Sequence, residues 1–230
     1  MKRIRRAYSK TVSLIDETAV QIYQSFVGKK KGFLLESYDK NNGRYVFMGK
    51  NPEEVIKSKE NGLVIEKEDG TTKELSGNPV DLLKGYYSDF EIRKDDEQLA
   101  FTGGLVGGLG YDFVRYKEEL PDNNPDEIGI STISLMLVTE FLSIDHFAET
   151  MTAVVVEDDT EAGRKKAMFR CEEMVKEAFA NIRKDEKSEF QSDGKIIKQS
   201  DTLEEYSEKV NKIKQYIIAV SYTHLRAHET

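Results

Sequence analysis

The chain has 230 residues, enough for one large domain or for one domain and the start of another. Hydrophobic residues make up 38% of the chain and charged residues 33%, so a core is possible beneath a heavily charged surface. A formal net charge of −8 repels phosphate groups, and the basic cluster at residues 1–6 has no basic stripe behind it. This composition argues against a nucleic-acid-binding protein.

The sequence also argues against a membrane protein. No apolar run approaches the roughly 20 residues that a membrane span needs, and no apolar stretch of the kind found in signal peptides follows the basic start. We therefore expect a cytoplasmic protein. Cys171 is the one cysteine, so no internal disulfide can form. Because it lies on the apolar stripe of a predicted helix with no histidine nearby in sequence, we expect a core thiol.

The first half of the chain is predicted to contain two helices. The first begins at Asp16 as its N-cap and ends at Gly28. We expect its buried face to carry Val20, Tyr23 and Val27. The second helix covers residues 79–90 and has a proline in its first turn, where the missing N–H is tolerated.

Two hairpins are predicted between these helices. The segments "GFLLES" (residues 32–37) and "RYVFMG" (44–49) flank the turn signal Asn42-Gly43. The segments "GLVIEKE" (62–68) and "TTKEL" (71–75) flank Asp69-Gly70, which is a turn signal of the same type.

The second half begins with strands at 131–143 and 150–156, joined by a tight connection around Asp145-His146. Residues 160–183 form the clearest predicted helix. Its apolar stripe consists of Met168, Cys171, Val175, Phe179 and Ile182.

A polar linker at 184–201 precedes a last helix at 202–218, capped by Ser200 or Asp201. One side of that helix carries Leu203, Tyr206, Val210, Ile213 and Ile217. Because helices and strands do not alternate regularly, these elements indicate an α+β fold of antiparallel sheets with flanking helices.

Two patterns suggest chemistry at first sight. Five glycines at positions 103, 104, 107, 108 and 110 lack the Gly-Lys-Ser/Thr of a phosphate loop and the spacing of a dinucleotide fingerprint. Glycines in a strand more often mark a bend or a close backbone approach. His224 and His228 have the i, i+4 spacing of metal ligands on a helix, but no third ligand is evident, and His146 lies in a predicted turn. We therefore expect no metal site and no nucleotide site.

The end of the segment at residues 34–37 is a better candidate for ligand binding. Glu36 can pair with a cation such as the α-ammonium group of an amino acid, and the Ser37 hydroxyl can add one hydrogen bond. Together they could hold a zwitterion if an apolar pocket accepted its side chain. The alternative reading is a strand end followed by a turn, with no ligand.

Four strings in this order resemble the amino-terminal region of anthranilate synthase component I. They are "FLLES", "GRYVFMGKNP", "FTGGLVGGLGYDFVRYKEELP" and "YSEKVNKIKQYI". The resemblance implies the anthranilate/aminodeoxychorismate synthase-like fold, here incomplete. It also implies a lyase that converts chorismate and ammonia to anthranilate and pyruvate, with Mg²⁺, in tryptophan biosynthesis. The ammonia comes from glutamine through a partner glutamine amidotransferase subunit, component II.

The resemblance also implies a site for feedback inhibition by tryptophan. Leu35 is then expected on the pocket wall, Glu36 and Ser37 at the inhibitor's amino group, and Arg44 beside them. In this view residues 1–183 form the amino-terminal regulatory domain and 184–201 a linker.

Residues 202–219 then begin a truncated chorismate-binding domain, and no catalytic residue lies in this chain. The tail "VSYTHLRAHET" (220–230) departs from the family pattern and is expected to be unrelated, artefactual sequence, with accidental histidines. Two alternatives remain open at this point. One is aminodeoxychorismate synthase component I of the folate pathway, and the other is a standalone amino-acid-binding module without enzyme activity.

Overall fold

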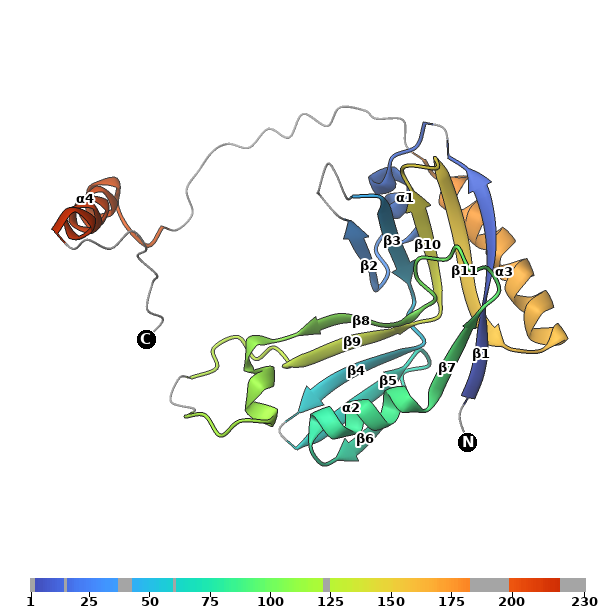
Figure 1. Cartoon of the computed structure of the whole chain (residues 1–230), viewed down its shortest axis with the longest axis horizontal. Coiled ribbons are helices and arrows are strands. Elements are labelled where there is room, and N and C mark those ends of the chain that lie inside the picture. The colour runs from blue at the N-terminus through green and yellow to red at the C-terminus, as the bar shows by residue number, and fades with distance from the viewer. Residues whose placement is uncertain are drawn as a thin grey trace. The chain divides into compact units, whose positions relative to one another are not determined.

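The computed structural model describes residues 3–14, 16–36, 43–59, 61–121, 125–182 and 199–219. The chain divides into two units, Met1–Lys184 and Asp185–Thr230. The first unit carries two sheets with flanking helices, and the second carries helix α4 (Leu203–Ala219) (Figure 1). The fold class is α+β, as the sequence predicts.

One sheet of the first unit has six strands in the order β2-β3-β10-β11-β1-β7. Its strands are β1 (Arg3–Ser13), β2 (Gly32–Glu36), β3 (Tyr45–Lys50), β7 (Phe90–Lys94), β10 (Glu140–Asp145) and β11 (Thr150–Asp158). Neighbouring strands are antiparallel except β1 and β7, which are parallel. Strand β1 is absent from the predicted elements because its first residues read as a basic cluster. Arg5 and Arg6 are instead held in ion pairs with Glu53 and Asp159.

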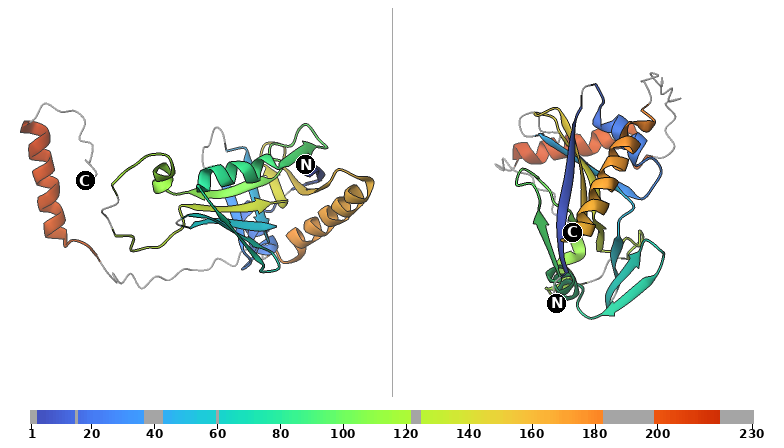
Figure 2. Two further views of the ribbon diagram at one scale, coloured as in Figure 1. Left: turned by 90° about the horizontal axis from the view of Figure 1, so that it is seen from below. Right: turned by 90° about the vertical axis from the view of Figure 1, so that its right-hand side faces the viewer.

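Helices α1 (Ala19–Phe26) and α3 (Glu161–Ala180) cover one face of this sheet (Figure 2). The core between them contains Cys171 and many small and aliphatic side chains of β3, β10 and β11. We call the other side of the sheet the helix-free face. The predicted helix at 160–183 is confirmed, and four of its five predicted stripe residues pack against the core from partly buried positions.

Two details of helix α1 correct the sequence prediction. The N-cap is Thr18, not Asp16, because Thr18 and Gln21 form a reciprocal capping box. The buried face carries Ala19, Ile22 and Phe26. Of the predicted face, Val27 is buried and Tyr23 packs against the core, whereas Val20 is 49% exposed and is therefore wrong.

The second sheet has the order β6-β5-β4-β9-β8. Its strands are β4 (Glu54–Lys59), β5 (Gly62–Lys67), β6 (Thr72–Ser76), β8 (Gly104–Leu109) and β9 (Ile133–Val138). Helix α2 (Pro79–Ser88) and the 3-10 helix η1 (Tyr111–Tyr116) pack on one face of it. The hairpin at Asp69-Gly70 and the helix beginning at Pro79 are therefore confirmed, with Asn78 as the N-cap.

The predicted single strand at 131–143 is wrong. It is two strands, β9 and β10, which belong to different sheets and are separated only by Thr139. The carbonyl oxygen of Thr139 accepts a hydrogen bond from the Val156 amide at 2.8 Å. Because both strands are apolar over most of their length, the residue pattern gives no signal for the change of sheet.

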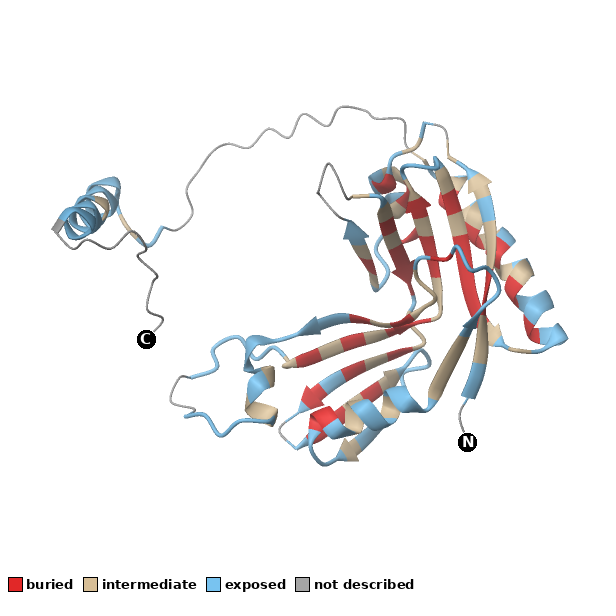
Figure 3. Cartoon of the chain, viewed as in Figure 1, coloured by how far each residue is buried: buried red, intermediate tan, exposed pale blue. Residues whose placement is uncertain are grey.

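A core of aromatic and aliphatic side chains joins the two sheets. Phe33, Val106, Val138 and Phe141 are buried there, with Phe47 and Phe101 packed against them. Figure 3 shows buried residues along the strands of both sheets up to the point where the sheets meet. This core fixes the β2–β3 hairpin, and therefore the candidate ligand residues, relative to the second sheet.

The glycine cluster lies mainly on strand β8. A Cβ atom on Gly107 would lie 2.1 Å from the carbonyl oxygen of Ser134 on the paired strand β9, at a backbone φ of +154°. The glycine is therefore needed for close backbone approach, as the sequence prediction states.

In the second unit, the predicted helix at 202–218 forms as α4. Thr202 caps it together with Glu205, instead of the predicted Ser200 or Asp201. Leu203, Tyr206, Ile213 and Ile217 are exposed. Of the predicted linker, only residues 199–201 lie in the described ranges.

Candidate ligand site at the end of strand β2

Strand β2 ends with two of the four predicted site residues. Leu35 pairs with Phe47 and Glu36 pairs with Val46 in the antiparallel register of β2 and β3. Paired residues in antiparallel strands point to the same face. Leu35 therefore lies beside Phe47 on the helix-free face, where it is 47% exposed. Ser37 and the turn residue Asn42 lie outside the described residues.

Aromatic rings extend the apolar surface beside Leu35. The ring of Phe47 stacks on Tyr45 at a centroid distance of 6.0 Å and meets the edge of Phe101 at 5.6 Å. The ring of the buried Phe141 completes the cluster, with its centroid 4.8 Å from that of Phe101. An exposed leucine beside such a cluster offers a flat apolar wall of the kind that an aromatic side chain prefers.

Glu36 is exposed at the edge of the sheet. Within the described ranges its carboxylate makes no hydrogen bond or ion pair. It is thus available to a ligand cation. However, neighbouring strand residues point to opposite faces. Glu36 can reach a ligand on the Leu35 side only around the end of the strand.

Arg44 stands just before β3 and is held by contacts within the protein. Its guanidinium donates from Nε at 3.0 Å and from Nη2 at 2.6 Å to the carboxylate of Asp145. The rings of Tyr45 and Phe147 lie 4.8 and 5.7 Å from the guanidinium carbon. The hydrogen bonds from Arg44 hold the pKa of Asp145 below its usual range. Arg44 is therefore first a structural residue, which the sequence did not indicate.

A cavity of about 480 Å³ adjoins Arg44 on the helix-free face. The connection between β7 and β8, which crosses this face (Figure 1), contributes Leu99 and Phe101 to its wall. The sheet contributes hydroxyl groups from Thr11, Ser143, Thr150 and Thr152. Its size is within the range of small-molecule sites. Of the four predicted site residues, Arg44 lines this cavity, whereas Leu35 and Glu36 do not.

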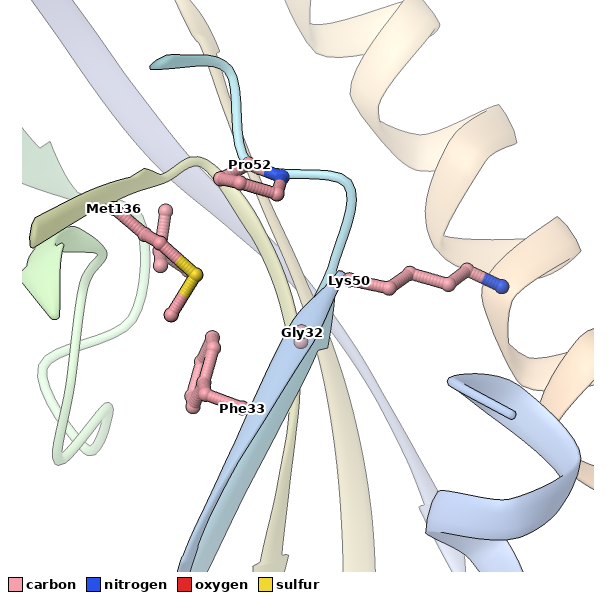
Figure 4. A pocket seen from close by; sticks show the side chains of 7 residues that line it. Gly32, Phe33, Lys50, Pro52 and Met136 are labelled. Carbon is pink, nitrogen blue, oxygen red and sulfur yellow. The ribbon is translucent and has the colours of Figure 1, made fainter. Parts of the chain in front are cut away.

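The other end of the hairpin is packed rather than open. Gly32, Phe33, Pro52 and Met136 surround a hollow that has no room for a water-sized molecule (Figure 4). The side chain of Lys50 leaves the strand on the opposite side, toward helix α3. We therefore place no ligand at this end.

The remaining candidate residues have structural roles or lie outside the described part. Cys171 is buried, and burial raises the pKa of its thiol to about 12, as expected for a core thiol. His146 lies in the turn between β10 and β11. Among the described residues, no three histidine, cysteine or acidic side chains form a metal-binding group. His224 and His228 fall outside those residues, and no described helix is long and apolar enough to cross a membrane.

Comparison with known proteins identifies the class. A family model described as chorismate binding enzyme matches residues 31–224. The chain therefore belongs to the family of chorismate binding enzymes. The matched range spans residues 184–201 and extends into the second unit.

Individual relatives are more specific. Anthranilate synthase component 1 of Acetivibrio thermocellus is 33% identical over 141 residues, which are 60% of this chain and 28% of that protein. The protein of that name from Pseudomonas putida is 28% identical over 213 residues, covering 88% of this chain and 43% of its own. The resemblance drawn from the sequence strings is confirmed by these matches. The chain spans less than half the length of these curated relatives.

A solved structure is also similar, that of anthranilate synthase component I from Streptococcus pneumoniae TIGR4. It is 21% identical, with a TM-score of 0.47, over 90% of this chain and 45% of its own.

Proposed function

We propose that this chain is the amino-terminal part of an anthranilate synthase component 1 and that it forms one wall of a tryptophan feedback site. The whole protein converts chorismate and ammonia to anthranilate and pyruvate in tryptophan biosynthesis. Residues 1–183 form the regulatory domain, and the catalytic residues lie in a chorismate-binding domain of which residues 202–219 are the beginning. The observation that carries this proposal is the match to relatives of that name over 88% of the chain.

The arrangement of the β2–β3 hairpin supports the binding part of the proposal. The indole ring of tryptophan lies against Leu35 and the aromatic cluster around Phe47. Its α-ammonium group pairs with Glu36 and Ser37 at the end of the strand, because a carboxylate and a hydroxyl there can replace water around the cation. Arg44 supplies a positive charge nearby.

The name component 1 implies a second component. We propose that this partner is a glutamine amidotransferase subunit that releases ammonia from glutamine, and that the complex is cytoplasmic. Magnesium belongs to the chorismate chemistry of the whole enzyme. Because the described residues of this chain form no metal-binding group, the magnesium ligands belong to the remainder of the whole enzyme.

A chimaera tests the proposal. Residues 31–219 of this chain replace the matching part of the Pseudomonas putida protein, and the product formed from chorismate and ammonium is identified by mass spectrometry. We expect anthranilate and pyruvate, and inhibition by L-tryptophan. The unmodified Pseudomonas putida protein is the control.

Other results contradict the proposal in distinguishable ways. An active chimaera that forms anthranilate but is not inhibited by L-tryptophan contradicts the feedback site and favours the folate-pathway relative. Tight tryptophan binding by the isolated chain, together with a folded but inactive chimaera, identifies an amino-acid-binding module instead. Circular dichroism of the chimaera establishes that it is folded in each case.

A further inference from the structure

Asp145 joins the start of β3 to the turn between β10 and β11. It pairs with Tyr45 in the register of β3 and β10, and its carboxylate receives the fork of hydrogen bonds from Arg44. The same carboxylate accepts hydrogen bonds from the amides of Phe147 at 3.0 Å and Ala148 at 3.2 Å. The His146 amide in turn donates to the Arg44 carbonyl oxygen at 2.9 Å. The turn and the arginine therefore form one connected group.

These contacts fix the orientation of the Arg44 guanidinium. Nε and Nη2 are directed at Asp145, while Tyr45 and Phe147 flank the planar group. In the described part of the chain, no acceptor reaches Nη1. The arginine side chain is 51% exposed, whereas that of Asp145 is 14% exposed. The more exposed guanidinium thus depends on the less exposed carboxylate for its position.

We infer that Asp145 is a positioning residue of the ligand site: it orients Arg44 so that Nη1 can bind the carboxylate of an amino-acid ligand. The inference rests on the proposed function. There Glu36 and Ser37 bind the ligand's ammonium group, and here Arg44 binds its carboxylate. An unpaired arginine samples many rotamers, and the loss of that freedom on binding lowers affinity. The pair of hydrogen bonds to the Asp145 carboxylate removes this cost before the ligand binds. The hydroxyl groups of the adjoining cavity offer further hydrogen bonds to the carboxylate.

The structure supplies a matched control. Arg6 makes a similar fork to Asp159, with Nε at 2.7 Å and Nη2 at 3.1 Å from its carboxylate. The Asp159 side chain is 23% exposed, follows the last residue of β11 and is not among the residues that line the cavity beside Arg44. The variants Asp145→Asn and Asp159→Asn each remove one charge from a fork of this kind. Asp145→Glu keeps the charge and tests rescue.

The experiment is an NMR titration of the full chain with L-tryptophan, following the Arg44 Nε–H signal and the Leu35 methyl signals. We expect both to shift in the parent and in Asp159→Asn. In Asp145→Asn, we expect broadening of the Arg44 signal and at least a fivefold weaker response of Leu35. Asp145→Glu should recover part of that loss.

Each contrary result has a separate meaning. An Asp145→Asn chain with the parent's Arg44 signal and affinity overturns the inference. A response of Leu35 without one of Arg44 in the parent also overturns it but leaves the proposed function standing. If neither residue responds in the folded parent chain, this inference is overturned, whereas inhibition of the chimaera by L-tryptophan still decides the proposed function.

Discussion

The ammonium group of Lys50, on strand β3, donates a hydrogen bond over 2.7 Å to the carbonyl oxygen of Phe26 at the end of helix α1. The same group lies 3.9 Å from the centroid of the Phe26 ring and forms an ion pair with Glu177 of helix α3. One buried cation therefore connects the hairpin that carries the candidate ligand site to both covering helices. Glu177 also receives a hydrogen bond from Arg170, so the carboxylate has two cationic partners.

Replacing this cation should destabilise the first unit. We expect Lys50→Met to lower the free energy of unfolding by about 2 kcal/mol, because the Phe26 carbonyl loses its donor and Glu177 loses a buried partner. Lys10→Met is the matched control, since Lys10 on β1 pairs with Glu172 on α3 where both side chains are exposed. Its cost should be below about 1 kcal/mol. Equal losses in urea denaturation of the two variants would contradict this account.

The close approach of β8 to β9 predicts a difference between two neighbouring glycines. In Gly107→Ala the new methyl group collides with the Ser134 carbonyl, so we expect a loss of about 2 kcal/mol or more. A Cβ atom on Gly108 meets nothing within 4 Å, so Gly108→Ala should change stability by less than about 0.5 kcal/mol. Thermal unfolding of both variants checks the expected order, and a reversed order would show that β8 and β9 pair differently.

The N-terminus of helix α1 offers a test of the observed cap against the predicted one. Removing the capping side chain in Thr18→Ala should cost about 1 kcal/mol, because the amide of Gln21 loses its acceptor. Asp16→Ala should be nearly neutral, since Asp16 lies outside the capping box. Urea denaturation of both variants compares them, and a larger effect at Asp16 would restore the predicted helix start.

The Arg44–Asp145 fork predicts a pH dependence of stability. Because the pKa of Asp145 is lower in the folded chain than in the unfolded one, the ionised form stabilises the fold above the unfolded pKa of about 3.9. That stabilisation is lost as the pH falls through the folded pKa. Asp145→Asn should therefore be less stable than the parent at pH 6, and the difference should shrink toward pH 3. A constant difference, measured by urea denaturation at both pH values, would argue against the fork.

Local patterns predicted the elements whose boundaries are marked by turn residues. Asp69-Gly70 fixed one hairpin, and Pro79 marked the start of α2. The long apolar stripe of α3 was also readable, because a 20-residue helix repeats its pattern several times.

Long-range pairing could not be predicted in the same way. Strand β1 is identified only by its partners β11 and β7, which are distant in sequence. The change of sheet at Thr139 also depends on which strands lie alongside.

The candidate site shows the same division between local and distant information. The strand end at Leu35 and Glu36 followed from the alternation of residues and the turn. The hydrogen bonds between Arg44 and Asp145 could not be predicted from the sequence, because the two residues are 101 positions apart. Only the strand register of β3 and β10 brings them together.

The most direct test of the central claim is the tryptophan sensitivity of the chimaera with Ser37→Ala. We expect the tryptophan concentration for half-inhibition to rise at least tenfold, equivalent to about 1.4 kcal/mol of binding free energy, while kcat for anthranilate formation stays unchanged. An active Ser37→Ala chimaera that is as sensitive to tryptophan as its parent would contradict the claim that this strand end forms a wall of the feedback site.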